Sequence, residues 1–509
     1  MYNLRNKYTP IIEYLSKLSE LSEVESKKTL LKEIKEKLNS LPNDEVKNIA
    51  QNINYNIIFA ELFSNDREVI EQLCDVLETL LNTLDGGEIY EKYHDAITKA
   101  LNLDDPAIKS LTLKEFLRTT NDPEKLSEIR EDLHVLGAIL KSLGDEDLTI
   151  VNMAGVILKK IANHPSGIKL LCMQFHKDLI ELMSQNSICA FRVLEIIVDI
   201  STASKDGLQA CDKAGFFNCL FSLLSDNEVL VQLNALELLT KLALNPEGLK
   251  YLEKREVLVK LADKIAQASD DPLSALLIPG LMKFFGNVAQ NSPNEIFSKY
   301  PVVISALFEV INAADLAVLP VALDTLGHIA KRVEGKYALE SLGPAMPQTM
   351  KRLVEVMKKM TSEIKILALN NLALILGVES SEQDNRILSL TKSWFDLLGD
   401  DPLDLIVGFC KQPFADIRQA GLEVLAVVAS QNWGQEYIAN APGLIEFLLD
   451  RNIENFKECK EAKFEVVQRL RSAGQDIFDP NTMHRFLTFV NQGPMHIETI
   501  TEVATEGAF

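Results

Sequence analysis

The stretch LNALELLTKLALNPEGLKYL (residues 233–252) decides the fold, because its pattern returns twice further along the chain. VALDTLGHIAKRVEGKYAL (321–339) and AGLEVLAVVASQNWGQEYI (420–438) also have a closing alanine followed five residues later by a glycine. The apolar positions recur at helical spacing and therefore share one face of an α-helix. A glycine after a helix either adopts the left-handed conformation that ends it or turns the chain toward the next helix. The pattern predicts a repeated helical unit.

A pair of small or apolar residues seven positions apart marks the end of this helix along most of the chain. The pairs are Leu77/Leu84, Leu113/Thr120, Gly155/Ala162, Leu194/Ser201, Leu236/Ala243, Met282/Ala289, Leu323/Ala330, Leu369/Leu376 and Leu422/Ala429. Successive pairs are 36 to 53 residues apart, and a period of about 40–47 residues is typical of HEAT and armadillo repeats. No stretch alternates like a β-strand. We therefore predict an all-α, curved, HEAT/armadillo-like solenoid of about 9–11 helix–turn–helix repeats.

The repeats divide the chain into three predicted parts. Residues 1–60 lack the repeat pattern and are expected to form an N-terminal helical cap. Residues 61–475 are expected to form the solenoid. Residues 476–509 are predicted to be a degenerate C-terminal helix followed by a mobile tail, because the helical pattern fades there.

The stretch GLMKFFGNVAQNSPNEI (280–296) has two glycines, a lysine and an aromatic pair, a combination that suggests a ligand site. It lacks the GxxxxGK[ST] pattern of a phosphate-binding loop, and it belongs to the repeat. We expect Pro279 and the glycine after it to kink or restart the helix. Gly286 is predicted to let neighbouring helices approach closely, and Phe284 and Phe285 to lie in the core.

Composition narrows the classes of partner. Lys and Arg total 52 against 73 Asp and Glu, a formal net charge of −21. An acidic chain repels nucleic acid and anionic lipid, since both bind through Lys and Arg. We expect neither as a partner. No apolar run approaches the length of a membrane span. Residues 1–18 lack the apolar centre of a signal peptide.

The seven cysteines are irregularly spaced and form no Cys-x-x-Cys motif. Such cysteines usually behave as small buried apolar residues. Their pattern fits a reduced compartment, which makes the protein cytoplasmic or nuclear. The seven histidines are scattered without metal-ligand spacing, and no nucleophile-elbow motif occurs. We therefore predict a protein that is not an enzyme and needs no metal or cofactor.

The surface of the repeats offers candidate binding residues. Counted back from the closing residue, positions −1, −4, −7 and −8 share the apolar side of the helix, whereas positions −2 and −6 point away from it. Repeat arrays of this kind bind partners on the concave surface lined by such helices. The alternative for each residue is a solvated helix face. The predicted partner-binding residues are Lys160, Glu195, Asp199, Glu237, Lys241, Lys283, Asn287, Asp324 and His328.

Several long stretches closely resemble the 26S proteasome non-ATPase regulatory subunit 5 family. They are DDPLSALLIPGLMKFFGNVAQ (270–290), SWFDLLGDDPLDL (393–405), QPFADIRQAGLEVLAVVASQNW (412–433), APGLIEFLLDR (441–451) and the final residues Glu506 to Phe509. The resemblance is strong over residues 230–509 and weakens toward the N-terminus.

The resemblance implies an assembly chaperone for the base of the proteasome regulatory particle. Members of the family bind the C-terminal domain of one AAA+ ATPase subunit through the inner surface of the solenoid. They escort a module that includes the neighbouring ATPase and a large non-ATPase scaffold subunit, and they leave before the mature particle forms. We expect this chain to be a monomer when free.

A second hypothesis is a karyopherin or armadillo-type adaptor that binds extended peptides carrying basic localisation signals. The acidic charge suits such a ligand. Asn287 occupies the place where armadillo arrays carry a peptide-clamping asparagine. The equivalent positions hold Asp199, Lys241 and His328, so the ladder of asparagines that would clamp an extended peptide is missing. A folded partner recognised by mixed charge fits these residues better.

Overall fold

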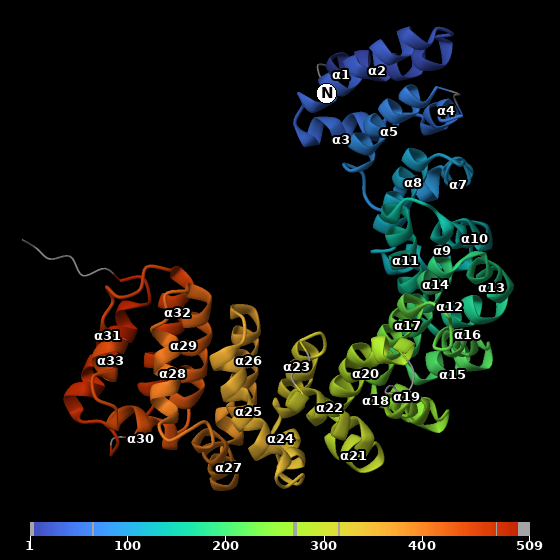
Figure 1. Ribbon diagram of the computed structural model, residues 1–509. Coiled ribbons are helices and arrows are strands. Elements are labelled where there is room, and N and C mark those ends of the chain that lie inside the picture. The colour runs from blue at the N-terminus through green and yellow to red at the C-terminus, as the bar shows by residue number, and fades with distance from the viewer. Residues whose placement is uncertain (1–4, 64–65, 268–271, 314–315, 475, 497–509) are drawn as a thin grey trace, which may run out of the picture. The chain divides into compact units, whose positions relative to one another are not determined.

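The computed structural model describes residues 5–63, 66–267, 272–313, 316–474 and 476–496, and these ranges contain helices and no β-strand (Figure 1). The predicted all-α helical-repeat fold is therefore confirmed. The chain divides into two units, Met1–Asn227 and Glu228–Phe509, and each is described by itself. The three predicted parts, 1–60, 61–475 and 476–509, remain a prediction, and the tail from residue 497 onward lies outside the described residues.

The first unit consists of helices α1 to α16 and three single turns of tighter or wider helix. The helices are α1 Arg5–Lys17, α2 Val24–Asn39, α3 Asn43–Gln51, α4 Tyr55–Glu61, α5 Arg67–Leu81, α6 Glu88–Lys92, α7 His94–Leu101, α8 Pro106–Thr119, α9 Pro123–Glu131, α10 Leu133–Lys141, α11 Leu148–Ala162, α12 Pro165–Lys169, α13 His176–Gln185, α14 Ser187–Ala203, α15 Lys205–Lys213 and α16 Phe216–Leu223. The single turns are the 3-10 helices Leu18–Glu20 and Ser142–Gly144 and the π-helix Leu170–Gln174.

The second unit continues with helices α17 to α33 and one 3-10 turn, Ser380–Glu382. The helices are α17 Val229–Ala243, α18 Pro246–Lys254, α19 Val257–Ala266, α20 Pro272–Asn291, α21 Pro293–Lys299, α22 Pro301–Ala313, α23 Leu319–Ala330, α24 Val333–Glu340, α25 Ala345–Lys359, α26 Ser362–Leu376, α27 Asn385–Asp396, α28 Pro402–Cys410, α29 Ala415–Ala429, α30 Asn432–Asn440, α31 Leu444–Leu449, α32 Lys457–Leu470 and α33 Pro480–Gln492.

The repeat contains three helices, so the predicted helix–turn–helix unit was wrong. A long helix such as α17 is followed by a short one, α18, and a third, α19. The residues read as a turn begin the short helix: Asn245 accepts hydrogen bonds from the N–H groups of Glu247 and Gly248, and Pro246 occupies the first turn. Both are favourable at a helix start. Asn and Pro are typical of turns and of helix starts alike, so the sequence pattern did not distinguish the two here.

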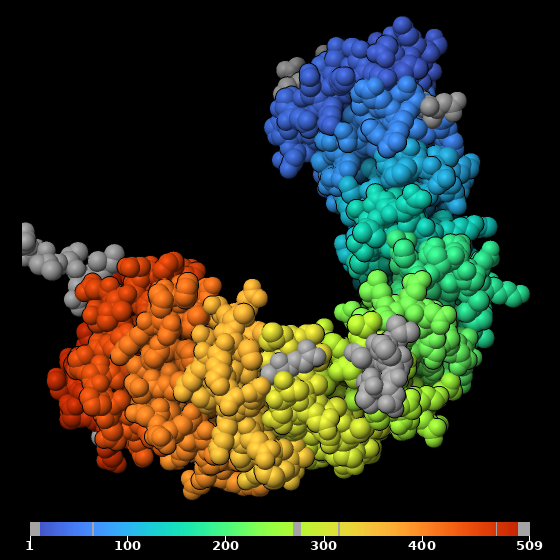
Figure 2. Space-filling model, in the orientation of Figure 1, coloured from blue at the N-terminus to red at the C-terminus, as the bar shows by residue number. Residues whose placement is uncertain are grey.

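The long helices stack side by side within each unit. In the second unit α17 packs against α20, α20 against α23, α23 against α26, α26 against α29, and α29 against α32. In the first unit the stack runs through α2, α5, α8, α11 and α14. Figure 2 shows the same order, since colours within a unit follow one another as bands in chain order. Each repeat thus packs on its sequence neighbours, as expected for a solenoid.

In four repeats a glycine lies five residues after the closing alanine, and it does not adopt the left-handed conformation considered above. Gly248, Gly335 and Gly434 lie in the first turn of α18, α24 and α30, and none has a positive φ. A Cβ atom would lie 2.1, 1.8 and 2.0 Å from the carbonyl oxygens of Leu242, Ile329 and Val428, respectively. Gly167 meets Ile161 in the same way at 1.9 Å. We call this contact the joint: it lets the short helix begin directly against the end of the long one.

Polar side chains next to the joint glycine bind the carbonyls at the end of the long helix. Lys336 is fully buried, and its Nζ donates to the carbonyl oxygens of Ala330 in α23 and, at 3.0 Å, Leu374 in α26. Gln435 occupies the same position in a later repeat, and its Nε2 donates to the Ala429 carbonyl at 3.0 Å. These bonds satisfy carbonyls that a helix end leaves without intrahelical partners. Lys336 also connects two successive repeats.

The stretch with two glycines and two phenylalanines is core. Helix α20 is continuous through Pro279, so the predicted restart does not occur. Phe284 and Phe285 are buried, as predicted, and their rings meet edge to face at 5.2 Å. A Cβ at Gly286 would lie 2.7 Å from Thr325 Cγ2 on α23. The predicted close approach of neighbouring helices at Gly286 is therefore confirmed.

The cysteines and the apolar helices serve packing. Six of the seven cysteines are buried, Cys219 is half-buried, and all are free thiols. No single helix in the described ranges is both long and apolar enough to cross a membrane. Helices α21 and α22 meet that test only when taken together, across a bend of 94°. Ile296, Leu307 and Ile311 of this pair are buried in the repeat array.

Candidate functional site

The candidate residues of the second unit lie on three neighbouring long helices. They are Glu237 and Lys241 on α17, Lys283 and Asn287 on α20, and Asp324 and His328 on α23. Asn287 is half-buried, and the other five are exposed. Because α20 packs against both α17 and α23, these residues form a polar strip on the surface made by the long helices of this unit. We call that surface the long-helix face.

The helical phase behind these predictions holds on α23. His328 and Asp324, at positions −2 and −6, are exposed. Ile329, Leu326 and Leu323 at positions −1, −4 and −7 are buried. A helix places these two sets of positions on opposite sides at 100° per residue. The strip is therefore available to a partner, while its assignment as a binding site remains a prediction.

Asp324 is held in place by the next repeat. Its Oδ1 accepts a hydrogen bond of 3.0 Å from Nδ2 of Asn371 on α26, and the same nitrogen donates to the Leu367 carbonyl at 2.9 Å. Asn371 is buried and fits only because Gly327 lacks a side chain: a Cβ there would lie 1.9 Å from Asn371 Oδ1. The carboxylate of Asp324 is thus partly oriented before any partner arrives.

The candidates of the first unit form a smaller group on α11 and α14. Lys159, which sequence patterns did not single out, lies between the two acidic candidates. Its Nζ is 3.2 Å from Glu195 and 2.5 Å from Asp199. Burial lowers the pKa of Lys159, but the bond to Asp199 and the charges of both carboxylates outweigh this, so its pKa is raised. Lys160 instead binds Thr120 Oγ1 at 3.1 Å and Asn121 Oδ1 at 2.7 Å.

Helical phase alone did not predict that Lys159, and not Lys160, forms the ion pairs with Glu195 and Asp199. Lys160 lies at position −2 from Ala162, so helical phase favoured it as the exposed residue. Both lysines are half-buried, and their long side chains reach sideways along the stack to whichever acceptor the next repeat offers. Glu195 is consequently 54% exposed and Asp199 only 19% exposed. Glu195 is the more accessible carboxylate of the pair.

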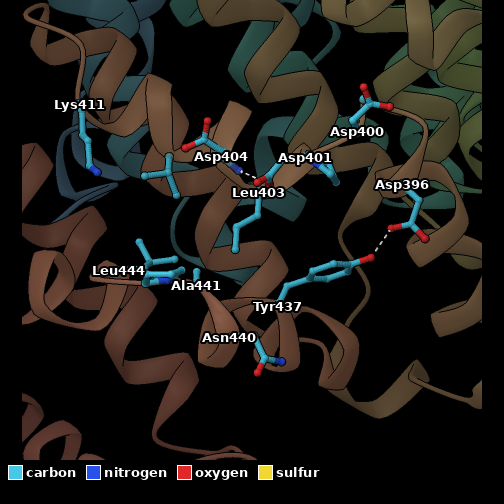
Figure 3. Close-up of a pocket in the computed structure, with 14 residues that line it drawn as sticks. Asp396, Asp400, Asp401, Leu403, Asp404, Lys411, Tyr437, Asn440, Ala441 and Leu444 are labelled. Carbon is cyan, nitrogen blue, oxygen red and sulfur yellow. Dashed lines mark hydrogen bonds between the residues drawn. The ribbon is translucent and has the colours of Figure 1, made fainter.

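A cavity of about 510 Å³ lies in the second unit beside α27, α28, α30 and α31 (Figure 3). None of its residues was predicted, although some belong to SWFDLLGDDPLDL. Leu403, Val407 and Leu444 contribute apolar surface. The polar residues around the cavity are Asp396, Asp400, Asp401, Asp404, Lys411, Tyr437 and Asn440. Helix ends and the loops between them form it together, and the phase of a single helix does not predict how such segments meet.

Two of the cavity carboxylates have structural roles. Asp396 accepts a hydrogen bond of 2.7 Å from the Tyr437 hydroxyl and lies 2.9 Å from Lys392 Nζ. The bond to Asp396 raises the pKa of Tyr437. Asp401 caps α28 by accepting from the N–H of Asp404 at 2.9 Å. Four aspartates and one lysine among the lining residues make this cavity acidic.

The described residues form a stack of helices with a charged surface. Exposed charges lie on stacked helices, and no group of three or more His, Cys, Asp or Glu side chains in the described part of the chain is placed to hold a metal ion. An extended repeat array with a polar face is the construction of a protein-binding scaffold. The fold and the charged surface are thus those of a helical-repeat scaffold protein. The chain belongs to the proteasome non-ATPase 26S subunit family, whose family model matches residues 13–508.

Relatives from several animals support the same family. The chain is 30% identical to the 26S proteasome non-ATPase regulatory subunit 5 of Homo sapiens, over 97% of this chain and 99% of the relative. The Bos taurus protein of the same name is 31% identical over the same shares. The Drosophila melanogaster protein is 30% identical over 86% of this chain and 85% of its own length. All three are named as non-ATPase regulatory subunits.

Solved structures of transport receptors share the fold. Importin beta aligns with a TM-score of 0.62 at 12% identity, over 96% of this chain and 65% of that one. Kap121p aligns with a TM-score of 0.52 at 11% identity, over 96% of this chain and 52% of its own. At such identities the likeness concerns the helical-repeat solenoid alone. The adaptor hypothesis therefore gains no functional support from it.

Proposed function

We propose that this chain is an assembly chaperone for the base of the 26S proteasome regulatory particle. It binds the C-terminal domain of an AAA+ ATPase subunit through the surface of its long helices and accompanies that subunit together with a base scaffold subunit. It leaves before the mature particle forms. The family match over residues 13–508 carries this proposal. The protein acts in the cytoplasm, with the nucleus as a second compartment, as a monomer when free and without catalysis.

The long-helix face suits a folded partner of mixed charge. Glu237, Lys283 and Asp324 alternate in sign across α17, α20 and α23. Such a pattern selects partners by charge complementarity and speeds their encounter, while wrongly placed like charges exclude others. A rigid stack also loses little conformational freedom on binding. A scaffold that covers one face of an ATPase domain blocks other contacts at that face until it is displaced.

The partner class is tested by affinity purification of the tagged full-length protein from cytosolic lysate, with and without nucleotide. We expect a subset of the base ATPases, together with a large non-ATPase subunit, and no core-particle subunits. Recovery of complete particles with their core would contradict a chaperone that leaves before maturation. Recovery of import receptors or signal-bearing cargo would favour the adaptor hypothesis instead.

The predicted binding residues of the two units are tested by reversing three charges together: Glu195→Lys on α14 of the first unit, and Glu237→Lys and Asp324→Lys on the long-helix face of the second unit. We expect weaker binding of the ATPase domain recovered in that purification, because exposed charges change association rate and desolvated pairs cost about 2–5 kcal/mol. The measurement is a titration by calorimetry or surface binding. Unchanged affinity in a variant that keeps its helical content would remove this face from the proposal.

A matched triple variant controls for the change in net charge. Asp206→Lys, Glu334→Lys and Glu436→Lys reverse three exposed carboxylates on the short helices α15, α24 and α30. Both triple variants change the formal charge equally. We expect the control to bind the ATPase domain as the wild type does. Equal losses in both variants would mean that net charge, and not the long-helix face, sets the affinity.

A further inference from the structure

Two large aromatic side chains are exposed at the start of adjacent long helices. Phe414 is 63% exposed before α29, and Phe456 is 53% exposed before α32. The two helices pack against each other, and Ile453 in the loop before α32 is also 47% exposed. Scattered apolar residues on a surface need no explanation, but a group on neighbouring elements often marks a binding site. None of the nine predicted partner-binding residues belongs to this group.

Arg418 connects the two loops that carry the rings. Its Nη1 donates to the carbonyl oxygens of Gln412 and Pro413, each at 2.9 Å. Its guanidinium forms an ion pair of 3.2 Å with Glu454, a side chain only 1% exposed. The same guanidinium lies 5.7 Å from the centre of the Phe456 ring. Charge-assisted bonds to a buried partner hold geometry well, so both rings are presented by loops that are already ordered.

An acidic groove lies beside the aromatic pair. It has a volume of about 270 Å³ and runs between α29 and α32, and it is lined by Gln419, Glu423, Ala426, Glu458, Glu461, Ala462 and Glu465. No Lys or Arg belongs to this lining. Lys457 and Arg469 reach Glu461 and Glu465 from outside, at 3.8 and 2.6 Å. Glu458 has no ion pair among the described residues, which leaves the groove negative at the end near Phe456.

We propose that Phe414, Phe456 and this groove bind a positively charged polypeptide segment that carries an apolar side chain. The apolar side chain packs on the aromatic rings, and Lys or Arg side chains lie against the glutamates. A second copy of this chain is a poor occupant, because its formal charge is −21. Nucleic acid is excluded by the same sign of charge. An exposed apolar group supplies contact area, and opposite charge steers the segment toward it and excludes acidic competitors.

The proposal shares with the proposed function only the use of the long-helix face. It needs no proteasome subunit for its test. If affinity purification returns no ATPase, the binding of a basic peptide at α29 and α32 can still be measured independently. If the peptide does not bind, the charge-reversal result at α17 and α23 is unaffected. The two ideas therefore fail separately.

The test uses the full-length protein and three fluorescein-labelled peptides measured by anisotropy. The first contains two Leu and four Lys among Gly and Ser, the second has Glu in place of Lys, and the third has Ser in place of Leu. We expect the first to bind at least about tenfold more tightly than the others, and its affinity to fall as salt rises. Equal binding of the Glu peptide would overturn the proposal.

Variants assign the binding to this surface. We expect Phe414→Ser with Phe456→Ser, and separately Glu423→Lys with Glu461→Lys, to weaken the Lys–Leu peptide at least about tenfold, a loss typical of central contacts. Phe63→Ser is the matched control, since Phe63 is also 53% exposed just before a long helix, α5, in the first unit. Because Phe456 contacts Arg418, Phe414→Ser alone keeps the test valid if the double variant unfolds. Unchanged affinity in Phe414→Ser and in the Glu variant would overturn the assignment.

Self-association is measured in the same samples by sedimentation. We expect a monomer whose size does not depend on the aromatic pair. A wild-type dimer that becomes monomeric in the Phe414→Ser variant would mean that this surface binds a second copy of the chain, and it would overturn the proposal.

Discussion

Lys336 places an amine in the interior of the second unit, where carbonyl oxygens of two successive repeats accept its hydrogen bonds. Taking an ammonium group out of water is unfavourable unless polar partners replace the water. Burial accordingly lowers the pKa of Lys336 to about 7, and the charge of Glu382 opposes this only in part. In the unfolded chain the amine has its ordinary pKa of about 10.4. Folding therefore releases a proton over the intervening pH range.

We expect Lys336→Met to change how stability depends on pH. Between the folded and unfolded pKa values the unfolded wild type binds more protons, so its free energy of unfolding gains a contribution that rises with pH. The variant lacks that contribution. Urea unfolding at pH 7 and at pH 9.5 should show the difference between wild type and variant moving in favour of the wild type at the higher pH. A difference that stays constant would mean that the amine keeps its ordinary pKa in the folded protein.

The joint between long and short helix depends on a position without a side chain. At Gly434 a Cβ would lie 2.0 Å from the Val428 carbonyl oxygen, which belongs to backbone and cannot rotate away. The helices must separate to admit a methyl group. Because α30 also holds Trp433 and Gln435, both buried, a shift of its first turn disturbs packing beyond the contact itself. Packing at the joint is thus sensitive to any added side chain in the repeats that contain it.

We expect Gly434→Ala to lower the free energy of unfolding by about 1–3 kcal/mol, the usual range for overpacking. Gly408 in α28 is the matched control, because a Cβ there meets nothing within 4 Å and its φ is not positive. Gly408→Ala should raise stability by about 0.5–1 kcal/mol, since alanine favours helix over glycine. Urea denaturation of the two variants gives both values. A Gly434→Ala protein as stable as the wild type would contradict the joint.

Sequence patterns predicted the long helices and the exposed side of α23 correctly, because helical periodicity depends on residues close in sequence. The short helices that directly follow the long ones, α18, α24 and α30, escaped prediction, since residues such as Asn245 and Pro246 are typical of turns and helix starts alike. The recurrence of Gly335 and Gly434 indicated that these positions cannot carry a side chain. The reason could not be predicted, because it is the nearby carbonyl oxygen of Ile329 or Val428, which packing brings close. Lys159 and the cavity near Tyr437 depend on neighbouring repeats or on loops. Local pattern carries no information about such contacts.

At the scale of the whole molecule the chain forms two units that meet between Asn227 and Glu228. Helix α17 begins at Val229, directly after this boundary. Repeat spacing is regular across the boundary, which is why sequence patterns predicted no division there. Each unit buries its own apolar core, for example Ile157 and Val193 in the first and Leu326 and Leu372 in the second.

We expect fragments 1–227 and 228–509 each to fold when expressed separately, because repeat arrays draw their stability from contacts between neighbouring repeats. Circular dichroism should show high helical content and a cooperative thermal transition for both. The two folded fragments can then be tested separately for partner binding, since the candidate residues fall in both units. A fragment without a cooperative transition would mean that its core requires the other unit.

The joint also bears on how such chains change length over evolution. The closing alanine and the joint glycine are separated by the same five positions in Ala162 and Gly167, Ala243 and Gly248, Ala330 and Gly335, and Ala429 and Gly434. Repeat lengths nevertheless differ, since from α5 to α32 successive long helices start 39 to 53 residues apart. An insertion within the joint would force helix ends apart, whereas one in a loop between later helices of the repeat, such as the segment between α25 and α26, only lengthens a connection. Gaps in alignments of related chains, and sites that accept an inserted tag, therefore belong to those loops.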